Sequence, residues 1–269
     1  MTEAGAGKRN ELWVVACLLL VAGSVLGATP AGPVEIQIVC DESVANLRLR
    51  TDLGFCLYVR TPATSILFDA AHDPDILMEN LAALGIPLSS ITHVVISHHH
   101  ADHRGGLARL ALQSPTFQLW LPRSVPEDLQ QLALAGGVHP KLVEEPRELA
   151  PGVWVTGPLG DASKEQVLVV HAPSGAIILT GCAHPGLVQI VSRVKQHWGF
   201  NEIALLGGGF HLLRVEEAEI VSIIEGLQKL NVKRVMPAHC TGERAKRLFR
   251  KAWGFNYVPA GAGRRIVIE

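Results

Sequence analysis

The sequence predicts a layered α/β fold, and three observations lead to that prediction. Short apolar runs of the kind that form strands crowd the first third of the chain, and strands alternate with helices through the last third. Such alternation is typical of helices packed on a sheet. In addition, segments rich in glycine and histidine follow several of the strands, and strand ends are where ligand sites gather in such sheets.

Composition limits the class of protein. The chain has 269 residues, of which 48% are hydrophobic and 18% charged, which suits a well-buried globular domain. The formal net charge is -1 and no run of lysine and arginine stands out, so a nucleic-acid partner is not expected. No repeat or long linker divides the chain, and we expect one domain over residues 33–269. The sequence does not predict the oligomeric state.

The N-terminal segment differs from the rest. Lys8 and Arg9 precede an apolar run from Leu12 to about Val25, and small residues follow at positions 27–31. This is the pattern of a secretory signal peptide, and the run is short for a membrane span, which needs about 20 apolar residues. We expect a signal peptide over residues 1–28 and an exported protein, periplasmic or secreted. The alternative is that the segment stays uncleaved as an N-terminal anchor. The protein would then contact a membrane only through this segment.

The elements of the N-terminal half are predicted from apolar runs between turn residues. A helix is expected from Asp73, suited to an N-cap, through Pro74 in the first turn to a stop at Gly85. The expected strands are Val34–Cys40, Gly54–Arg60, Ser65–Asp69, Thr92–Ser97 and Phe117–Leu121.

In the C-terminal half, three more strands lead into a regular alternation of helix and strand. The expected strands are Val153–Thr156, Gln166–His171, Ala176–Thr180, Glu202–Leu206 and Lys233–Met236. The expected helices are Gly186–Gln196, Glu216–Leu230 and Glu243–Ala252.

The strongest functional signal is the H-x-H-x-D-H spacing that begins at residue 98, directly after a predicted strand. His98 and His100 are two residues apart, so they can face the same way and hold one metal ion. Asp102 and His103, on the following turn, can face a second ion. Imidazole and carboxylate are ligands that zinc and similar divalent metals take. A tract that binds metal incidentally would not place one aspartate at a fixed offset after a strand. His99 points away and is expected to have a supporting role.

Three other histidines, His184, His211 and His239, lie near glycines where predicted strands end. Backbone at glycine can approach an ion closely. We predict His184 and His239 as further ligands, while for His211 a role in the site and a purely structural role are equally open.

Four cysteines follow the N-terminal segment, and their spacings match neither a zinc knuckle nor a redox pair. Cys40 and Cys56 fall on strands predicted to be neighbours, and export would permit a disulfide. Spacing in sequence does not predict one, because a disulfide needs specific sulfur geometry.

Together these segments resemble the metallo-β-lactamase superfamily, and more narrowly the branch that includes the dihydropterin ribofuranosyl-aminobenzene-phosphate synthase of methanopterin biosynthesis. The resemblance runs from about Asn46 to the C-terminus. It rests on the H-x-H-x-D-H spacing and on T-D-L-G-F at 51–55, I-L-F-D at 66–69, T-G-C-A-H-P-G at 180–186, G-G-F-H-L at 208–212 and P-A-H-C-T-G at 237–242. It implies an αββα sandwich of two mixed sheets with helices on the outer faces.

The resemblance also implies which residues bind metal. His98 and His100 would hold the first ion, Asp102 and His103 the second, and His239 would complete the second site. The expected cofactor is a pair of zinc ions, with manganese or iron as alternatives.

Two positions depart from the family pattern. Asp69 matches a buried aspartate that orients the metal loop, but Ala70-Ala71 follows where glycine is usual, so the local turn can differ. Many members have T-G-D where this chain has Thr180-Gly181-Cys182, and the family aspartate bridges the ions. Either the Cys182 thiolate takes that position, or His184 supplies the missing ligand with support from Cys182. We favour His184.

The expected chemistry follows from the ions, because a divalent metal lowers the pKa of bound water from 15.7 to roughly 7. We expect hydrolysis of a small-molecule ester, amide, lactone or phosphoester by metal-bound hydroxide. Asp102 would orient the nucleophile and relay a proton, and His211 would contact the substrate or stabilise the oxyanion. Two alternatives stay open: a pterin-type synthase reaction, which the expected export disfavours, and a non-catalytic exported metal-binding protein.

Overall fold

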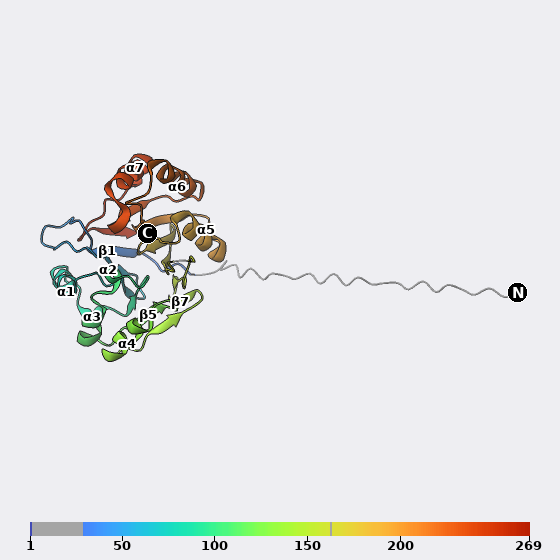
Figure 1. Ribbon diagram of the computed structural model, residues 1–269. Helices are drawn as coiled ribbons and strands as arrows, with labels where there is room; N and C mark the ends of the chain where they lie inside the picture. Colours follow the sequence, from blue (N-terminus) through green and yellow to red (C-terminus); the bar gives the residue numbers. More distant parts are fainter. Residues whose placement is uncertain (2–28, 162) are drawn as a thin grey trace.

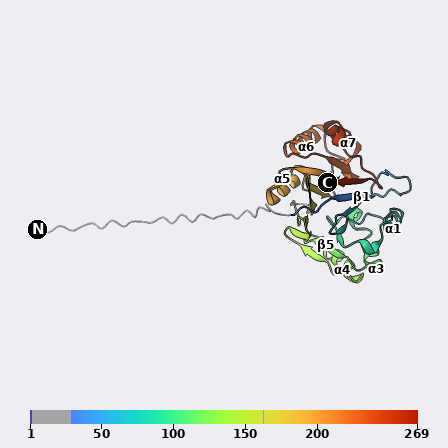
Figure 2. The same cartoon turned by 180° about the vertical axis from the view of Figure 1, so that it is seen from behind.

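The computed structural model describes residue 1, residues 29–161 and residues 163–269. Two sheets pack against each other across a shared apolar core, and helices cover their outer faces (Figure 1, Figure 2). This is the αββα sandwich that the resemblance implied, so the predicted fold class is confirmed.

The first sheet has seven strands in the order β13-β1-β2-β3-β4-β5-β6. Neighbours from β13 to β3 are antiparallel, and those from β3 to β6 are parallel. The strands are β1 (Val34–Cys40), β2 (Cys56–Arg60), β3 (Ser65–Phe68), β4 (His93–Val95), β5 (Gln118–Pro122), β6 (Lys141–Val143) and β13 (Arg265–Ile268).

The second sheet has six strands in the order β12-β11-β10-β9-β8-β7. Strands β10, β11 and β12 are parallel to one another, and the other pairs are antiparallel. The strands are β7 (Arg147–Ala150), β8 (Val153–Val155), β9 (Leu168–Ala172), β10 (Gly175–Thr180), β11 (Ile203–Gly209) and β12 (Val235–Ala238).

The helices are α1 (Pro74–Ala83), α2 (Ala101–Arg104), α3 (Leu107–Gln113), α4 (Glu127–Ala135), α5 (Leu187–Trp198), α6 (Glu217–Lys229) and α7 (Glu243–Trp253), with short 3-10 turns at Leu88–Ser90, His239–Thr241 and Gly254–Asn256. Helix α1 begins as predicted, because the Asp73 carboxylate accepts hydrogen bonds from the backbone N–H groups of Asp75 and Ile76. It ends at Ala83, and Gly85, which follows the C-cap residue Leu84, has a φ of 69° in the left-handed region that glycine adopts readily.

The interior forms three apolar layers. The layer between the sheets takes side chains from both of them, for example Phe68 of β3 and Ile177 of β10. The outer layers lie beneath α1, α3 and α4 on one side and beneath α5, α6 and α7 on the other. Fully burying one such side chain contributes about 1.5–3 kcal/mol. The packed layers therefore hold the strand ends in a fixed relation to one another.

The predicted strands and helices are confirmed, with ends that differ by a few residues. The main difference is β11, which continues to Gly209 instead of ending at Leu206. Its glycines remain in the ladder because they pair with β10 on one side and with β12 on the other. Patterns did not predict α4, β6, β7 or β13. These three strands lie at sheet edges and are partly exposed, and their apolar runs are short.

Two other expectations concern the cysteines of β1 and β2 and the N-terminal segment. Cys40 and Cys56 do lie opposite each other on β1 and β2, and both thiols are free. The expected signal peptide falls on residues 2–28, outside the described residues, so export and anchoring stay predictions. Among the residues that the structure describes, no helix is both long and apolar enough to cross a membrane.

Candidate metal centre

Loops from both sheets meet at one edge of the sandwich. They follow β3, β4, β10, β11 and β12, and they carry Asp69, residues 97–103, residues 181–184, His211 and His239 respectively. The parallel pairing of β3 with β4, of β10 with β11 and of β11 with β12 directs the carboxyl ends of these strands the same way within each sheet. As a result, residues far apart in the sequence approach one another here.

The first ligand set contains His98, His100 and His184, whose ligand atoms all lie within 4.8 Å of one another. The Nε2 atom of His98 is 3.0 Å from His100 Nδ1 and 3.2 Å from His184 Nε2. Burial lowers the pKa of His98 far below its usual range, and burial with neighbouring His211 lowers that of His184 to about 4. At neutral pH these imidazoles are uncharged, and each has a lone pair for a cation.

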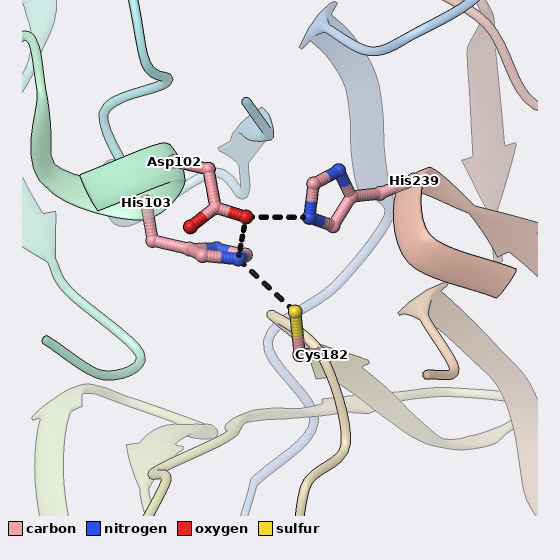
Figure 3. Close-up of side chains that lie close together, drawn as sticks. All are labelled: Asp102, His103, Cys182 and His239. Atoms are coloured by element: carbon pink, nitrogen blue, oxygen red, sulfur yellow. Dashed lines mark hydrogen bonds and ion pairs between the residues drawn. The ribbon is translucent and has the colours of Figure 1, made fainter. Parts of the chain in front are cut away.

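The second ligand set contains Asp102, His103, Cys182 and His239 (Figure 3). The His103 Nε2 atom lies 3.1 Å from Cys182 Sγ and 3.5 Å from Asp102 Oδ2, and His239 Nε2 lies 3.2 Å from the same carboxylate oxygen. Burial raises the pKa of Asp102, but contact with His239 and the charge of His103 outweigh it and hold that pKa well below its usual range. Asp102 is therefore ionised at neutral pH.

A third group, Cys182, His184 and His211, overlaps the other two. The ring centroids of His184 and His211 are 4.4 Å apart, and the His211 backbone N–H donates to Cys240 Sγ at 3.3 Å. This third group joins Cys182 of the second set to His184 of the first set, so the Cys182 thiol lies between the two sets. The geometry therefore allows Cys182 and His184 both to act as ligands, one in each set.

Asp69 links the two ligand sets through hydrogen bonds. It is fully buried, and its carboxylate accepts hydrogen bonds from the Ser97 backbone N–H at 2.6 Å and the Ser97 hydroxyl at 2.8 Å. The Ser97 oxygen is 2.9 Å from His98 Nδ1, and His103 Nδ1 is 2.7 Å from Asp69 Oδ2. Protons on both Nδ1 atoms satisfy these contacts, which leaves Nε2 of each ring free to bind a metal.

The environment of His103 is strongly polar despite its burial. Burial alone would lower its pKa, but the charge of Asp69 and the hydrogen bond to it raise the pKa to about 9. In the metal-free protein His103 is therefore an imidazolium at neutral pH, and it must release a proton before it can act as a ligand.

The turn after Asp69 is formed without the usual glycine. Ala71 adopts a φ of 56°, and the backbone N–H groups of Gly105 and Gly106 donate to the carbonyls of Ala71 and Ala70, both at 2.8 Å. A Cβ at Gly105 would come within 1.9 Å of the His72 carbonyl oxygen. The glycines that permit this close approach are supplied by the metal loop itself.

Sequence reasoning missed Glu165, which shapes the loop after β10. This carboxylate is fully buried and accepts four backbone hydrogen bonds, at 2.8, 3.1, 3.1 and 3.0 Å, from residues 181–184. It thereby holds the loop that presents both Cys182 and His184. No local signal marks Glu165, because an acid preceding a strand usually lies in solvent.

Asp41 and Glu42, which were also missed, surround His239. Asp41 is buried and accepts the His239 backbone N–H at 2.8 Å, while a Glu42 oxygen is 3.6 Å from His239 Nδ1. Phe55 stacks on the imidazole with ring centroids 5.7 Å apart. An acid directly after strand β1 was the available signal for Asp41.

The donor groups fit divalent metal ions. His239 Nε2 is buried without a hydrogen-bond partner among the described residues, although it faces the Asp102 carboxylate. Leaving such an atom unsatisfied is costly, and a cation between the two would satisfy both. Imidazole, carboxylate and thiolate are the donors that zinc takes, and iron also accepts them. His99 belongs to neither set, and its carbonyl accepts a hydrogen bond from Arg104.

Comparison with known proteins gives the class. Residues 49–239 match the model of the metallo-beta-lactamase superfamily. Because this match covers well over half of the chain, the protein belongs to that superfamily, most members of which are metal-dependent enzymes.

Individual relatives narrow the comparison. The chain is 28% identical over 249 residues to the 7,8-dihydropterin-6-methyl-4-(beta-D-ribofuranosyl)-aminobenzene-5'-phosphate synthase of Methanocaldococcus jannaschii, which covers 75% of this chain and 83% of that protein. The crystal structure of Tm1679, a metal-dependent hydrolase of the beta-lactamase superfamily, superposes with a TM-score of 0.76 at 27% identity, covering 87% of this chain and 98% of that one. The anti-Pycsar protein Apyc1 of a Bacillus phage is 35% identical over only 80 residues, which is 28% of this chain and 30% of that protein.

Proposed function

We propose that the protein is a metal-dependent hydrolase that acts on an ester, amide, lactone or phosphoester of a small molecule. The observation that carries this proposal is the presence of two adjacent ligand sets, His98–His100–His184 and Asp102–His103–Cys182–His239, with Cys182 between them. Divalent ions held at such sets activate water as a nucleophile and polarise a carbonyl or phosphoryl oxygen.

The residues around the sets have distinct roles in this proposal. Asp102 is an ionised carboxylate, and its second oxygen is available to orient water and to accept its proton. Asp69 and Glu165 keep the ligands in place before substrate arrives, which reduces the reorganisation needed during the reaction.

Exposure indicates the side from which a substrate approaches. His103, Cys182 and His239 are buried, whereas His100 and His184 are only half-buried and His211 is exposed. A substrate would therefore arrive over His211. From that position the His211 imidazole can donate a hydrogen bond to charge that develops on the substrate.

A second candidate is a synthase reaction of the pterin type. The relative from M. jannaschii favours this candidate, because its name is that of a synthase and the match spans 83% of its length. The same ligands would serve it, but the nucleophile would come from a second substrate instead of water.

Metal content and turnover together test the proposal. We expect about two zinc, manganese or iron ions per chain by elemental analysis, and chelator-sensitive hydrolysis in a screen of phosphodiester, ester, lactone and β-lactam substrates. His98→Ala is expected to abolish turnover, and His99→Ala, next to it but outside both sets, serves as the matched control. A protein that binds metal but hydrolyses none of these substrates, and that turns over only when a second organic substrate is added, would reject hydrolysis in favour of the synthase reaction.

A further inference from the structure

A pocket of about 140 Å³ lies beside helix α7, and its lining includes Pro237 and Ser43. Its wall on the helix is made by Lys246, Arg247 and Arg250, and Tyr257 closes it from the C-terminal loop. None of these residues belongs to the metal-binding groups. The pocket is therefore a separate feature of the molecule.

The pocket has an excess of positive charge. Residues three and four apart on a helix are neighbours on its surface, so Lys246, Arg247 and Arg250 form one cationic face. Glu243 is the one acid in the lining, and its carboxylate lies 3.2 Å from Lys246 Nζ. Among the described residues, neither Arg247 nor Arg250 has an ion-pair partner. Like charges at this spacing repel one another, and an anion in the pocket would remove that repulsion.

Hydrogen-bond donors complete the lining. The Lys246 side chain is only 15% exposed, so part of its charge is already out of water. The Arg250 guanidinium lies over the Tyr257 ring, 5.0 Å from its centroid, which restricts its position. Burial raises the pKa of Tyr257, so its hydroxyl remains protonated and can donate. The Ser43 hydroxyl also lines the pocket, and it donates to Asp41 Oδ2 at 3.0 Å.

We propose that this pocket binds a phosphate group. A fork of guanidinium and ammonium donors matches the geometry of phosphate oxygens. A water molecule occupies about 30 Å³ of liquid, so the pocket has room for a phosphate group. Free inorganic phosphate and the phosphate end of a larger molecule share this chemistry. The proposal does not depend on hydrolysis at the metal centre.

Calorimetric titration of the full chain with inorganic phosphate tests the proposal at low ionic strength. We expect one phosphate to bind in this pocket and Arg250→Gln to weaken binding about tenfold, because each charge-assisted hydrogen bond contributes roughly that much. Lys251→Gln, an exposed cation on the same helix outside the lining, is the matched control and should bind as the unaltered protein does. Ser43→Asp places a negative charge in the lining from outside α7, so it should also prevent binding without a change in the helix.

Two further measurements distinguish free phosphate from the phosphate end of a larger molecule, and the pocket from the metal centre. Methylphosphonate, whose carbon–phosphorus bond resists hydrolysis, should bind as inorganic phosphate does if the pocket accepts the phosphate end of a larger molecule. Binding of inorganic phosphate alone would restrict the site to the free ion. Equal binding in the Arg250→Gln variant, loss of all binding on chelation of metal, or the absence of binding at millimolar phosphate would each overturn the proposal.

Discussion

The Sγ atoms of Cys182 and Cys240 lie 3.3 Å apart, although 58 residues separate them in the sequence. Strand β10 delivers Cys182 and the turn after β12 delivers Cys240. Cys182 Sγ is also 3.1 Å from His103 Nε2. A pair of thiols therefore lies beside the second ligand set, and the first two predictions concern this pair.

Mild oxidation is expected to join the two cysteines. The two thiols would lose two protons and two electrons to hydrogen peroxide, which is reduced to water, and a disulfide would form after the sulfurs move closer. Cys182 would then no longer be free to bind metal, so the metal content should fall. Peptide mapping under non-reducing conditions checks this, with Cys240→Ser as the control. A peroxide-treated protein that keeps both free thiols and all its metal would contradict the prediction.

The choice of metal is expected to depend on Cys182. Thiolate favours zinc and iron, whereas carboxylate suits manganese and magnesium. Cys182→Asp should therefore shift the zinc-to-manganese ratio toward manganese, while Cys182→Ala should lose the ion of the second set. Elemental analysis after competition between equal amounts of the two metals measures the ratio. An unchanged ratio in Cys182→Asp would show that the sulfur does not contact the metal.

The first ligand set is expected to be separable from the fold. His98→Ala combined with His100→Ala should remove one ion and leave the fold largely intact, because the sheets are stabilised by their apolar layers. His99→Ala is the control on the same loop. Metal content and circular dichroism are the measurements, and full occupancy in the double variant would sink the assignment.

Glu165 is expected to matter for stability as well as for metal affinity. Glu165→Ala would leave four backbone N–H groups in the loop after β10 without their acceptor. Each buried unsatisfied donor costs about 1–3 kcal/mol, so a loss of about 3 kcal/mol or more in the free energy of unfolding is expected. Urea unfolding measures it. Glu165→Gln retains one acceptor oxygen and should lose less, and equal stability of Glu165→Ala and the unaltered protein would exclude the role.

The stability of the metal-free protein is expected to depend on pH through His103 and Asp69. Against the effect of burial, Asp69 and, to a smaller extent, other nearby carboxylates raise the pKa of His103 from 6.5 to about 9. These contacts therefore stabilise the folded state fully below pH 6.5 and lose their effect as the pH rises through 9. The size of the effect is about 3 kcal/mol.

Comparison with Asp69→Asn isolates this contribution from other titrating groups. The difference in unfolding free energy between the unaltered protein and Asp69→Asn should be largest below pH 6.5 and should shrink toward pH 9. Urea unfolding of chelator-treated protein at a series of pH values provides the data. A difference that grows with pH would reverse the sign and reject the assignment of the proton to His103.

Much of the fold was predictable because its interior strands are strongly patterned. β1, for example, matches its predicted range Val34–Cys40, and the cap at Asp73 acts through its own side chain on the next residues. The edge strands β7 and β13 were not predictable, because they are short and partly exposed and carry only short apolar runs. β13 pairs with β1, which is distant in the sequence, whereas β7 pairs with β8, the next strand along the chain.

The sequence by itself determined the donor groups, because the H-x-H-x-D-H spacing places four candidate ligands within one loop. Only the tertiary structure decided how they divide. His184 joins His98 and His100, whereas Cys182, two residues earlier in the chain, joins Asp102 and His103. Glu165 makes this division by holding the backbone of residues 181–184. The physical reason is that this carboxylate and its four donors meet only when β9 and β10 are paired in the folded sheet.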